Sequence, residues 1–150
     1  MLITNIISGG QTGVDRAALD VALELGVPCG GWCPSGGRAE DGKLDPKYPL
    51  KETPSEDYTQ RTEWNVRDSD GTLILAFGAP SGGTAYTIEC AKRYRKPFLV
   101  IDMKNESSPE LFSEWVHQHH IKKLNVAGPR ESASPGVIYK RAKAILLNWL

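Results

Sequence analysis

Two glycine-rich segments, each lying between a short apolar run and a helical pattern, most strongly constrain the fold of this chain. Residues 3–7 are apolar and largely β-branched, as in a buried strand, and residues 8–13 follow with three glycines. From residue 14, apolar positions recur three and four apart up to Gly26, which predicts an amphipathic helix. Residues 71–84 repeat the apolar run and the glycine turn before a second helix. Repeated strand–turn–helix units predict a parallel α/β sheet.

The other elements complete this pattern. The predicted strands are residues 27–33, 98–101 and 124–127, and if the last two are neighbours, Arg130 and Ser132 lie beside both glycine turns. The predicted helices are residues 58–67, a helix capped by Ser108 with Pro109 at its first position, and a helix near the C-terminus. We therefore predict one Rossmann-like three-layer α/β domain over residues 1–150. Its mainly parallel sheet has about five strands, with helices on both faces.

A glycine turn between a strand and a helix points backbone N–H groups and a positive helix end at one place, which suits phosphate. Two familiar phosphate motifs do not fit. A P-loop needs Lys-Ser/Thr after its last glycine, but Val14 and Asp15 follow Gly13. A dinucleotide site needs an acidic residue at the end of the second strand, where this chain has Cys33 and Pro34.

Both turns are expected at the carboxyl edge of the sheet, where ligands bind in such folds. Arg38 lies in a long polar segment, residues 34–60, that could close over the site, and Arg16, Arg130 and Ser132 would supply charge and donors. The predicted ligand-binding residues are Gly9, Gly10, Gln11, Thr12, Gly13, Arg16, Arg38, Gly82, Gly83, Thr84, Arg130 and Ser132. Simple roles remain open: glycine also serves tight packing, Asp15 could complete a capping box with Thr12, and Arg16 could be a solvent-exposed charge.

Composition narrows the classes of partner. The 150 residues are 40% hydrophobic and 24% charged, with a net charge of +0, which gives no long-range attraction for nucleic acid or an anionic membrane. Three cysteines and no secretory signal favour reduced thiols and the cytoplasm. Neither the cysteines nor the histidines at 117, 119 and 120 have the spacing of a metal site, so we predict no protein-held metal.

Three segments resemble those of the family called putative molybdenum carriers, named after the molybdenum-cofactor carrier proteins. They are residues 9–17 (GGQTGVDRA), 65–72 (NVRDSDGT) and 124–132 (LNVAGPRES), and the resemblance runs along nearly the whole chain. This family is related to the lysine-decarboxylase-like (LOG) and DprA nucleotide-binding Rossmann folds. The resemblance implies an α/β domain of five or more strands, a homo-oligomer (dimer or tetramer), and a phosphate-bearing ligand.

The enzymes among these relatives hydrolyse nucleoside monophosphates with a P-G-G-x-G-T-x-x-E motif. The matching turn starts at Pro80 and is one residue shorter, and Glu89 comes five positions after Thr84 instead of three. Two extra helical positions rotate a side chain by about 200°. We therefore expect Glu89 to point away from the position of the catalytic glutamate, which favours binding over hydrolysis.

The first hypothesis is thus a carrier that binds molybdenum cofactor, a phosphorylated pterin, or a related phosphate ligand, and that has molybdoenzymes as further partners. The second is a LOG-like N-glycosidic hydrolase of nucleoside monophosphates, with Asp15, Asp70 and Glu89 as candidate carboxylates. The third is a nucleotide-sensing regulatory protein. No residue is assigned a catalytic role.

Overall fold

A computed structural model describes residues 2–150, and its centre is a five-stranded parallel sheet in the order β2-β1-β9-β7-β8. The strands are β1 (Asn5–Ile7), β2 (Cys29–Gly30), β7 (Gly71–Ala76), β8 (Phe98–Asp102) and β9 (Lys123–Ala127). Their registers pair Ile6 with Cys29 and with Leu124, and Leu73 with Val126 and with Leu99.

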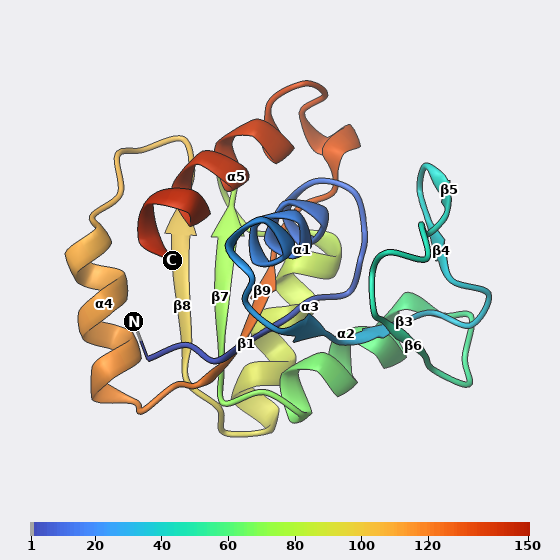
Figure 1. Cartoon of the computed structure of the whole chain (residues 1–150), viewed down its shortest axis with the longest axis horizontal. Helices are drawn as coiled ribbons and strands as arrows, with labels where there is room; N and C mark the ends of the chain where they lie inside the picture. The colour runs from blue at the N-terminus through green and yellow to red at the C-terminus, as the bar shows by residue number, and fades with distance from the viewer. Residues whose placement is uncertain (1) are drawn as a thin grey trace.

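Helices cover both faces of the sheet (Figure 1). On one face lie α1 (Val14–Leu25), α4 (Pro109–Gln118) and α5 (Ile138–Trp149), and on the other lie α2 (Tyr58–Arg67) and α3 (Gly82–Arg93). The predicted Rossmann-like three-layer α/β architecture is therefore confirmed.

The larger core fills the layer between the sheet and the face formed by α1, α4 and α5. There the alternate β7 residues Leu73 and Leu75 join the apolar faces of these helices, and the Phe112 and Trp149 rings stack 5.1 Å apart. On the opposite face a smaller apolar cluster is centred on Val66, Cys90 and Ala91. Buried polar side chains, including Asn65 of α2 and Thr84 and Thr87 of α3, lie on these two helices beside the smaller cluster.

Strand β9 is not the neighbour of β8, the arrangement on which the sequence-based placement of Arg130 and Ser132 beside both glycine turns depended. In the structure β9 pairs with β1 on one side and β7 on the other, so β7 separates it from β8. The buried run in β9 predicts a strand but contains nothing that specifies its neighbours, because a helical crossover can carry a parallel strand past one already in place.

The predicted strand at residues 27–33 is broken in two. Gly31, at φ 135°, separates β2 from β3 (Trp32–Cys33), and β3 pairs with β6 (Lys51–Glu52) in a second small sheet. A Cβ on residue 31 would lie 2.2 Å from the carbonyl oxygen of Ser8. Glycine is therefore needed here because the backbone passes so close to the end of β1.

The long polar segment is not structureless. Besides β6, it contains a hairpin of β4 (Arg38–Ala39) and β5 (Gly42–Lys43), with Glu40 and Asp41 at its tip. The hairpin projects from the same side of the molecule as the turn that follows β1 (Figure 1). Across from it lies a short 3₁₀ helix, η1 (Glu131–Ala133), which follows β9.

Helix ends largely follow the expected chemistry. Helix α2 has the predicted bounds, Ser108 accepts a hydrogen bond from the Leu111 N–H at the start of α4, and Gly26 closes α1 in the left-handed conformation. The capping box of Thr12 and Asp15 does not form, since the N-cap of α1 is Gly13 and no side chain caps this end. No helix in residues 2–150 has the length and apolar character that crossing a membrane requires.

Candidate functional site

A cleft of about 390 Å³ lies at the carboxyl ends of β1, β9 and β7. The chain leaves β1 through α1 toward β2 at one edge, and leaves β7 through α3 toward β8 at the other edge. Helices that depart in opposite directions leave a crevice between them, which is the usual ligand position in an open α/β sheet. Its walls are formed by Gly9, Gln11 and Asp15, by Arg61, Thr62 and Asn65 of α2, by residues 79–84 and Thr87, and by residues 125–130 and Ala133.

Buried polar side chains gather around this cleft. Ten polar or charged residues are buried in residues 2–150, and six of them line it. The six are Gln11, Asp15, Asn65, Thr84, Thr87 and Asn125. Polar groups are costly to bury, so their concentration at one cavity indicates a functional surface rather than a packing layer.

The start of α3 presents free donors to the cleft. Thr84 and Ala85 donate their N–H groups to the carbonyl of the N-cap Ser81, but within residues 2–150 the N–H groups of Gly82 and Gly83 have no acceptor. A Cβ on Gly83 would meet no atom within 4 Å. This helix end is therefore open to an anion, with unpaired N–H groups and the positive end of the helix dipole.

The turn before α1 is different, because the protein itself uses several of its donors. The Gln11 N–H donates to Asp15 Oδ2 over 3.3 Å, the Thr12 N–H to Gln11 Oε1 over 3.0 Å, and the Val14 N–H to the Pro129 carbonyl over 3.2 Å. In residues 2–150 the N–H groups of Gly9, Gly10 and Gly13 have no acceptor either, but these glycines are buried, whereas Gly82 and Gly83 are exposed. The free donors at α3 are therefore the more accessible ones.

The glycines of the first turn make room for neighbouring groups. A Cβ on Gly13 would lie 2.5 Å from the Pro129 carbonyl oxygen, and one on Gly10 would lie 2.6 Å from Leu50 Cδ1. On Gly9, it would lie 1.7 Å from the Nη1 atom of Arg61. Close packing, an alternative that the sequence left open, accounts for all three glycines.

Arg61 reaches from α2 across the cleft to a buried carboxylate. Its Nη1 lies 2.8 Å from Asp15 Oδ2, and the two side chains are only 12% and 6% exposed. Burial raises the pKa of the Asp15 carboxyl, and the charge and hydrogen bond of Arg61 oppose that rise. Two buried nitrogens here, Arg61 Nε and Gln11 Nε2, have no hydrogen-bond partner within residues 2–150.

Arg130 faces the same region from the end of β9. Its guanidinium carbon lies 5.7 Å from the centroid of the Tyr58 ring, and that of Arg61 lies 5.4 Å from the same ring. These cation–π contacts hold both guanidinium groups at the cleft wall. Arg61 was not among the predicted ligand-binding residues. The spacing of four between Arg61 and Asn65, which places both on one face of the predicted helix, could have identified it.

Ten of the twelve predicted site residues fall into two groups. Gly9, Gln11, Gly82, Gly83, Thr84 and Arg130 line the cleft, whereas Thr12, Gly13, Arg16 and Ser132 line a neighbouring hollow. Gly10 lies between them, against Leu44 and Leu50. Arg38 is exposed on β4 and lines neither space.

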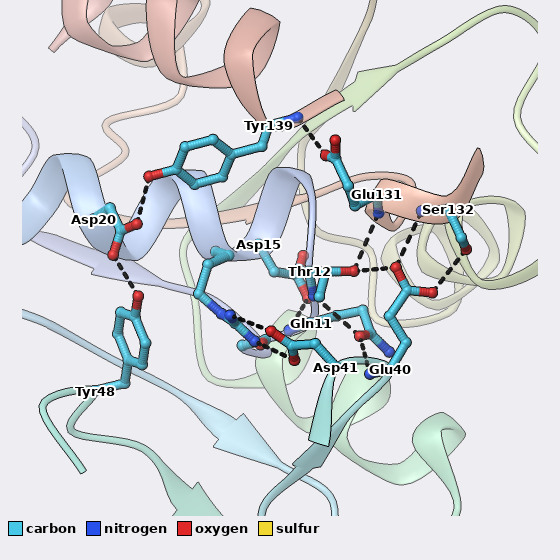
Figure 2. Close-up of polar contacts among 12 residues, drawn as sticks. Gln11, Thr12, Asp15, Asp20, Glu40, Asp41, Tyr48, Glu131, Ser132 and Tyr139 are labelled. Carbon is cyan, nitrogen blue, oxygen red and sulfur yellow. Dashed lines mark hydrogen bonds and ion pairs between the residues drawn. The ribbon is translucent and has the colours of Figure 1, made fainter. Parts of the chain in front are cut away.

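Carboxylates of the chain itself occupy the hollow (Figure 2). Arg16 binds Asp41 through both of its terminal nitrogens, at 3.0 and 3.1 Å. Glu40 accepts hydrogen bonds from the Thr12 hydroxyl and from the backbone and hydroxyl of Ser132. The Asp41 carboxylate thus accounts for the positive charge of Arg16 in the first turn of α1, where a cation opposes the helix dipole.

Only one of the three candidate carboxylates lies in the cleft. Asp15 lines it, Glu89 is exposed outside it, and Asp70 accepts the N–H groups of Lys122 and Lys123 near the amino end of β7. In residues 2–150, no three His, Cys, Asp or Glu side chains come together as metal ligands.

Comparisons with known proteins agree with this architecture. Residues 6–150 match the model of the circularly permutated YpsA SLOG family. The chain is also similar to a crystal structure, solved at 1.45 Å resolution, of a "putative molybdenum carrier protein" from Syntrophus aciditrophicus SB. The two share 48% sequence identity and a TM-score of 0.96, over 99% of this chain and 96% of that one.

A second solved structure, (E)-4-hydroxy-3-methyl-but-2-enyl diphosphate reductase, is 13% identical over 97% of this chain and 59% of that one. Its TM-score of 0.41 is too low to support any argument about this chain. A comparison with curated proteins finds no match.

Proposed function

Because this chain belongs to the circularly permutated YpsA SLOG family, we propose that its cleft binds a phosphate-bearing small molecule, with molybdenum cofactor as the leading candidate. The observation that carries this proposal is the open start of α3, where the Gly82 and Gly83 N–H groups have no acceptor in the described chain. The name of the relative from Syntrophus, a molybdenum carrier, supports the choice of ligand.

The two ends of such a ligand would meet different chemistry. The phosphate would accept hydrogen bonds from the backbone N–H groups of Gly82 and Gly83, and the guanidinium of Arg130 would offset its negative charge. The ring system would lie toward the side-chain amides of Gln11, Asn65 and Asn125, which line the cleft. Asn65 already bonds the Trp32 backbone with both ends of its amide, so within residues 2–150 the free groups are the Gln11 Nε2 donor and the Asn125 Oδ1 acceptor. A donor and an acceptor together complement the mixed edge of a pterin. Molybdenum would arrive within the cofactor, held by its dithiolene, so the protein need not supply metal ligands.

Binding without turnover is favoured by the arrangement of the acids. Asp15 is the sole carboxylate among the described residues that line the cleft, and it is already paired with Arg61. Glu89, on the helix that carries the hydrolase glutamate in the relatives, is exposed outside the cleft. A carrier would pass its ligand to molybdoenzymes, which are its proposed partners. Its three free cysteines suit the reducing cytoplasm in which we propose that it acts.

A second candidate is the N-glycosidic hydrolysis of nucleoside monophosphates, which one observation favours. Burial raises the pKa of Asp15 within the cleft, and a raised carboxyl pKa suits a proton donor to a leaving base. Incubation with AMP or GMP followed by detection of free base tests this reaction. Loss of base release in Asp15→Asn would assign the proton transfer to this residue.

A thermal-shift panel tests the binding proposal. The panel contains molybdenum cofactor released from a donor enzyme, GMP, AMP, ADP-ribose, molybdate and tungstate. A ligand at 100 times its Kd adds about 2.7 kcal/mol of stability, which raises the Tm by several degrees. A response to the cofactor alone supports the carrier, whereas a response to nucleotides alone overturns the choice of ligand.

A pair of variants assigns the response to the cleft. Gly83→Val places a side chain in open space at the start of α3 and should abolish binding while the fold is retained. Ala85→Val adds the same β-branched side chain at an exposed position of this helix outside the cleft, and it should bind normally. Normal binding by Gly83→Val would remove α3 from the site.

A further inference from the structure

One side chain of the β4–β5 hairpin links two loops that are far apart in the sequence. The Glu40 carboxylate accepts from the Ser132 hydroxyl at 2.7 Å, from the Ser132 N–H at 3.0 Å and from the Thr12 hydroxyl. The Glu40 N–H donates to Gln11 Oε1 at 2.8 Å. Figure 2 shows Glu40 lying between Gln11 and Thr12 on one side and Ser132 on the other.

These two loops follow the neighbouring strands β1 and β9 and form adjacent parts of the cleft wall. Gln11, which follows β1, lines the cleft directly, and so do Arg130 and Ala133, which flank Ser132. The loops also touch each other, because the Glu131 N–H donates to the Thr12 hydroxyl oxygen at 3.1 Å. Glu40 is therefore attached to the cleft wall at two points without being part of its lining.

The loop after β9 needs this support. Helix η1 is a single turn with no side-chain cap at its start, so its N–H groups depend on acceptors from elsewhere. The Glu40 carboxylate accepts the Ser132 N–H, and the Thr12 hydroxyl oxygen accepts the Glu131 N–H. The Arg16–Asp41 ion pair holds the tip of the hairpin against α1, which keeps Glu40 in reach.

We propose that Glu40 is a positioning residue that clamps the loop after β1 to the loop after β9, and thereby sets the geometry and ligand affinity of the cleft. This inference rests on the proposed function, because it concerns the same ligand site. Glu40 is itself exposed, so its contribution to global stability is small. Its effect is on preorganisation, because a cleft whose walls are already in place loses less entropy when a ligand binds.

The test compares Glu40→Ala with Glu40→Gln and with Glu52→Ala. Glu52 provides a matched control because it lies in the same polar segment, where its carboxylate accepts the Gly36 N–H. Within residues 2–150 it makes no side-chain hydrogen bond to either cleft loop. Hydrogen–deuterium exchange of residues 131–133 reports the clamp in unliganded protein. Titration calorimetry with GMP, a stable molecule that carries a phosphate and a pterin-like ring edge, reports affinity.

The expected result has three parts. Glu40→Ala exchanges faster at residues 131–133 and binds GMP roughly five- to tenfold more weakly, with little change in Tm. Glu40→Gln, which keeps one acceptor oxygen, gives an intermediate affinity, and Glu52→Ala resembles wild type. Adding Ser132→Ala to Glu40→Ala causes no further loss, because the two substitutions remove the same contact.

Two outcomes would overturn the clamp. Unchanged exchange in Glu40→Ala would mean that the loops hold together without it, and tighter GMP binding would mean that Glu40 competes with the ligand. A wild-type protein that binds neither GMP nor released molybdenum cofactor would instead count against the proposed function. The exchange measurement needs no ligand, so the two failures are distinguishable.

Discussion

Gly9 and Arg61 occupy one space: the position that a Cβ would take on Gly9 lies 1.7 Å from Nη1 of Arg61. That nitrogen lies 2.8 Å from Asp15, so the missing side chain at position 9 is what allows the guanidinium to reach the buried carboxylate. Gly9 resembles part of a phosphate loop, but in this protein its missing side chain leaves room for the ion pair between Arg61 and Asp15.

Gly9→Ala should therefore lower the free energy of unfolding by about 3 kcal/mol, because displacing Arg61 leaves Asp15 buried without its partner. Urea unfolding measures the loss. In the Arg61→Ala background the same substitution should cost little, since the ion pair is already absent. Equal costs in both backgrounds would show that the clash does not act through Arg61.

The cost of losing Arg61 should depend on pH. Burial already raises the pKa of Asp15, and Arg61→Met removes the group that opposes the rise. With a folded pKa above the unfolded one, the stability gained from the proton is present below the unfolded pKa and is lost as the pH rises through the folded pKa. Arg61→Met should hence destabilise less at about pH 4 than at about pH 7.5.

Urea midpoints at the two pH values test that dependence. Lys143→Met is a control, because Lys143 contacts Glu24 at 3.6 Å on the surface and should contribute little at either pH. A destabilisation by Arg61→Met that is equal at both pH values would mean that Asp15 does not take up a proton in the variant.

The indole of Trp32 should report the ionisation of Asp68. Asp68 accepts the Trp32 Nε1–H at 2.8 Å. Its pKa is lowered by the hydrogen bond from Arg67 and further by the one from Trp32, and partial burial opposes this lowering without cancelling it. These contacts persist above the unfolded pKa and are lost as the pH falls through the lowered folded pKa. The chemical shift of the Trp32 indole proton should therefore change with pH, with a midpoint below the ordinary pKa range of aspartate. In Asp68→Asn this pH-dependent change should be absent.

Asp20 should stabilise the hollow beside the cleft through two tyrosines. It accepts the hydroxyls of Tyr48 and Tyr139, which lie on opposite sides of it (Figure 2). Asp20→Ala leaves both hydroxyls without this acceptor and should cost about 1–3 kcal/mol in urea unfolding. Asp20→Asn, which keeps an acceptor oxygen, should cost less. Equal losses in the two variants would show that the hydrogen bonds are not the source.

Local sequence was sufficient for most of the elements. The bounds of α2, the Ser108 cap of α4 and the left-handed Gly26 at the end of α1 all follow from residues within a few positions of each other. The two glycine turns were correctly expected at the carboxyl edge of the sheet, because parallel strands joined by helices must all end there.

Which side chains meet in the site could not be predicted from the sequence, because they come from segments far apart in the chain and no local pattern specifies their contacts. Arg61 meets Asp15 across 46 positions, and Glu40 meets Ser132 across 92. Thr12, Arg16 and Ser132 have the donors of an anion site, yet they bind carboxylates of the β4–β5 hairpin, whose position the sequence of that segment does not reveal.

The sequence by itself determined where most of the strands and helices form and which edge of the sheet carries the glycine turns, because burial on one face appears as a period of two or 3.6 residues. Only the tertiary structure decided that β9 lies between β1 and β7. It also decided that the accessible helix end belongs to α3, because the Gln11 and Val14 N–H groups before α1 find acceptors in Asp15 and Pro129 and the glycines of that turn are buried. Hydrogen bonding between distant segments, unlike periodicity, depends on which neighbours the folded chain brings into reach.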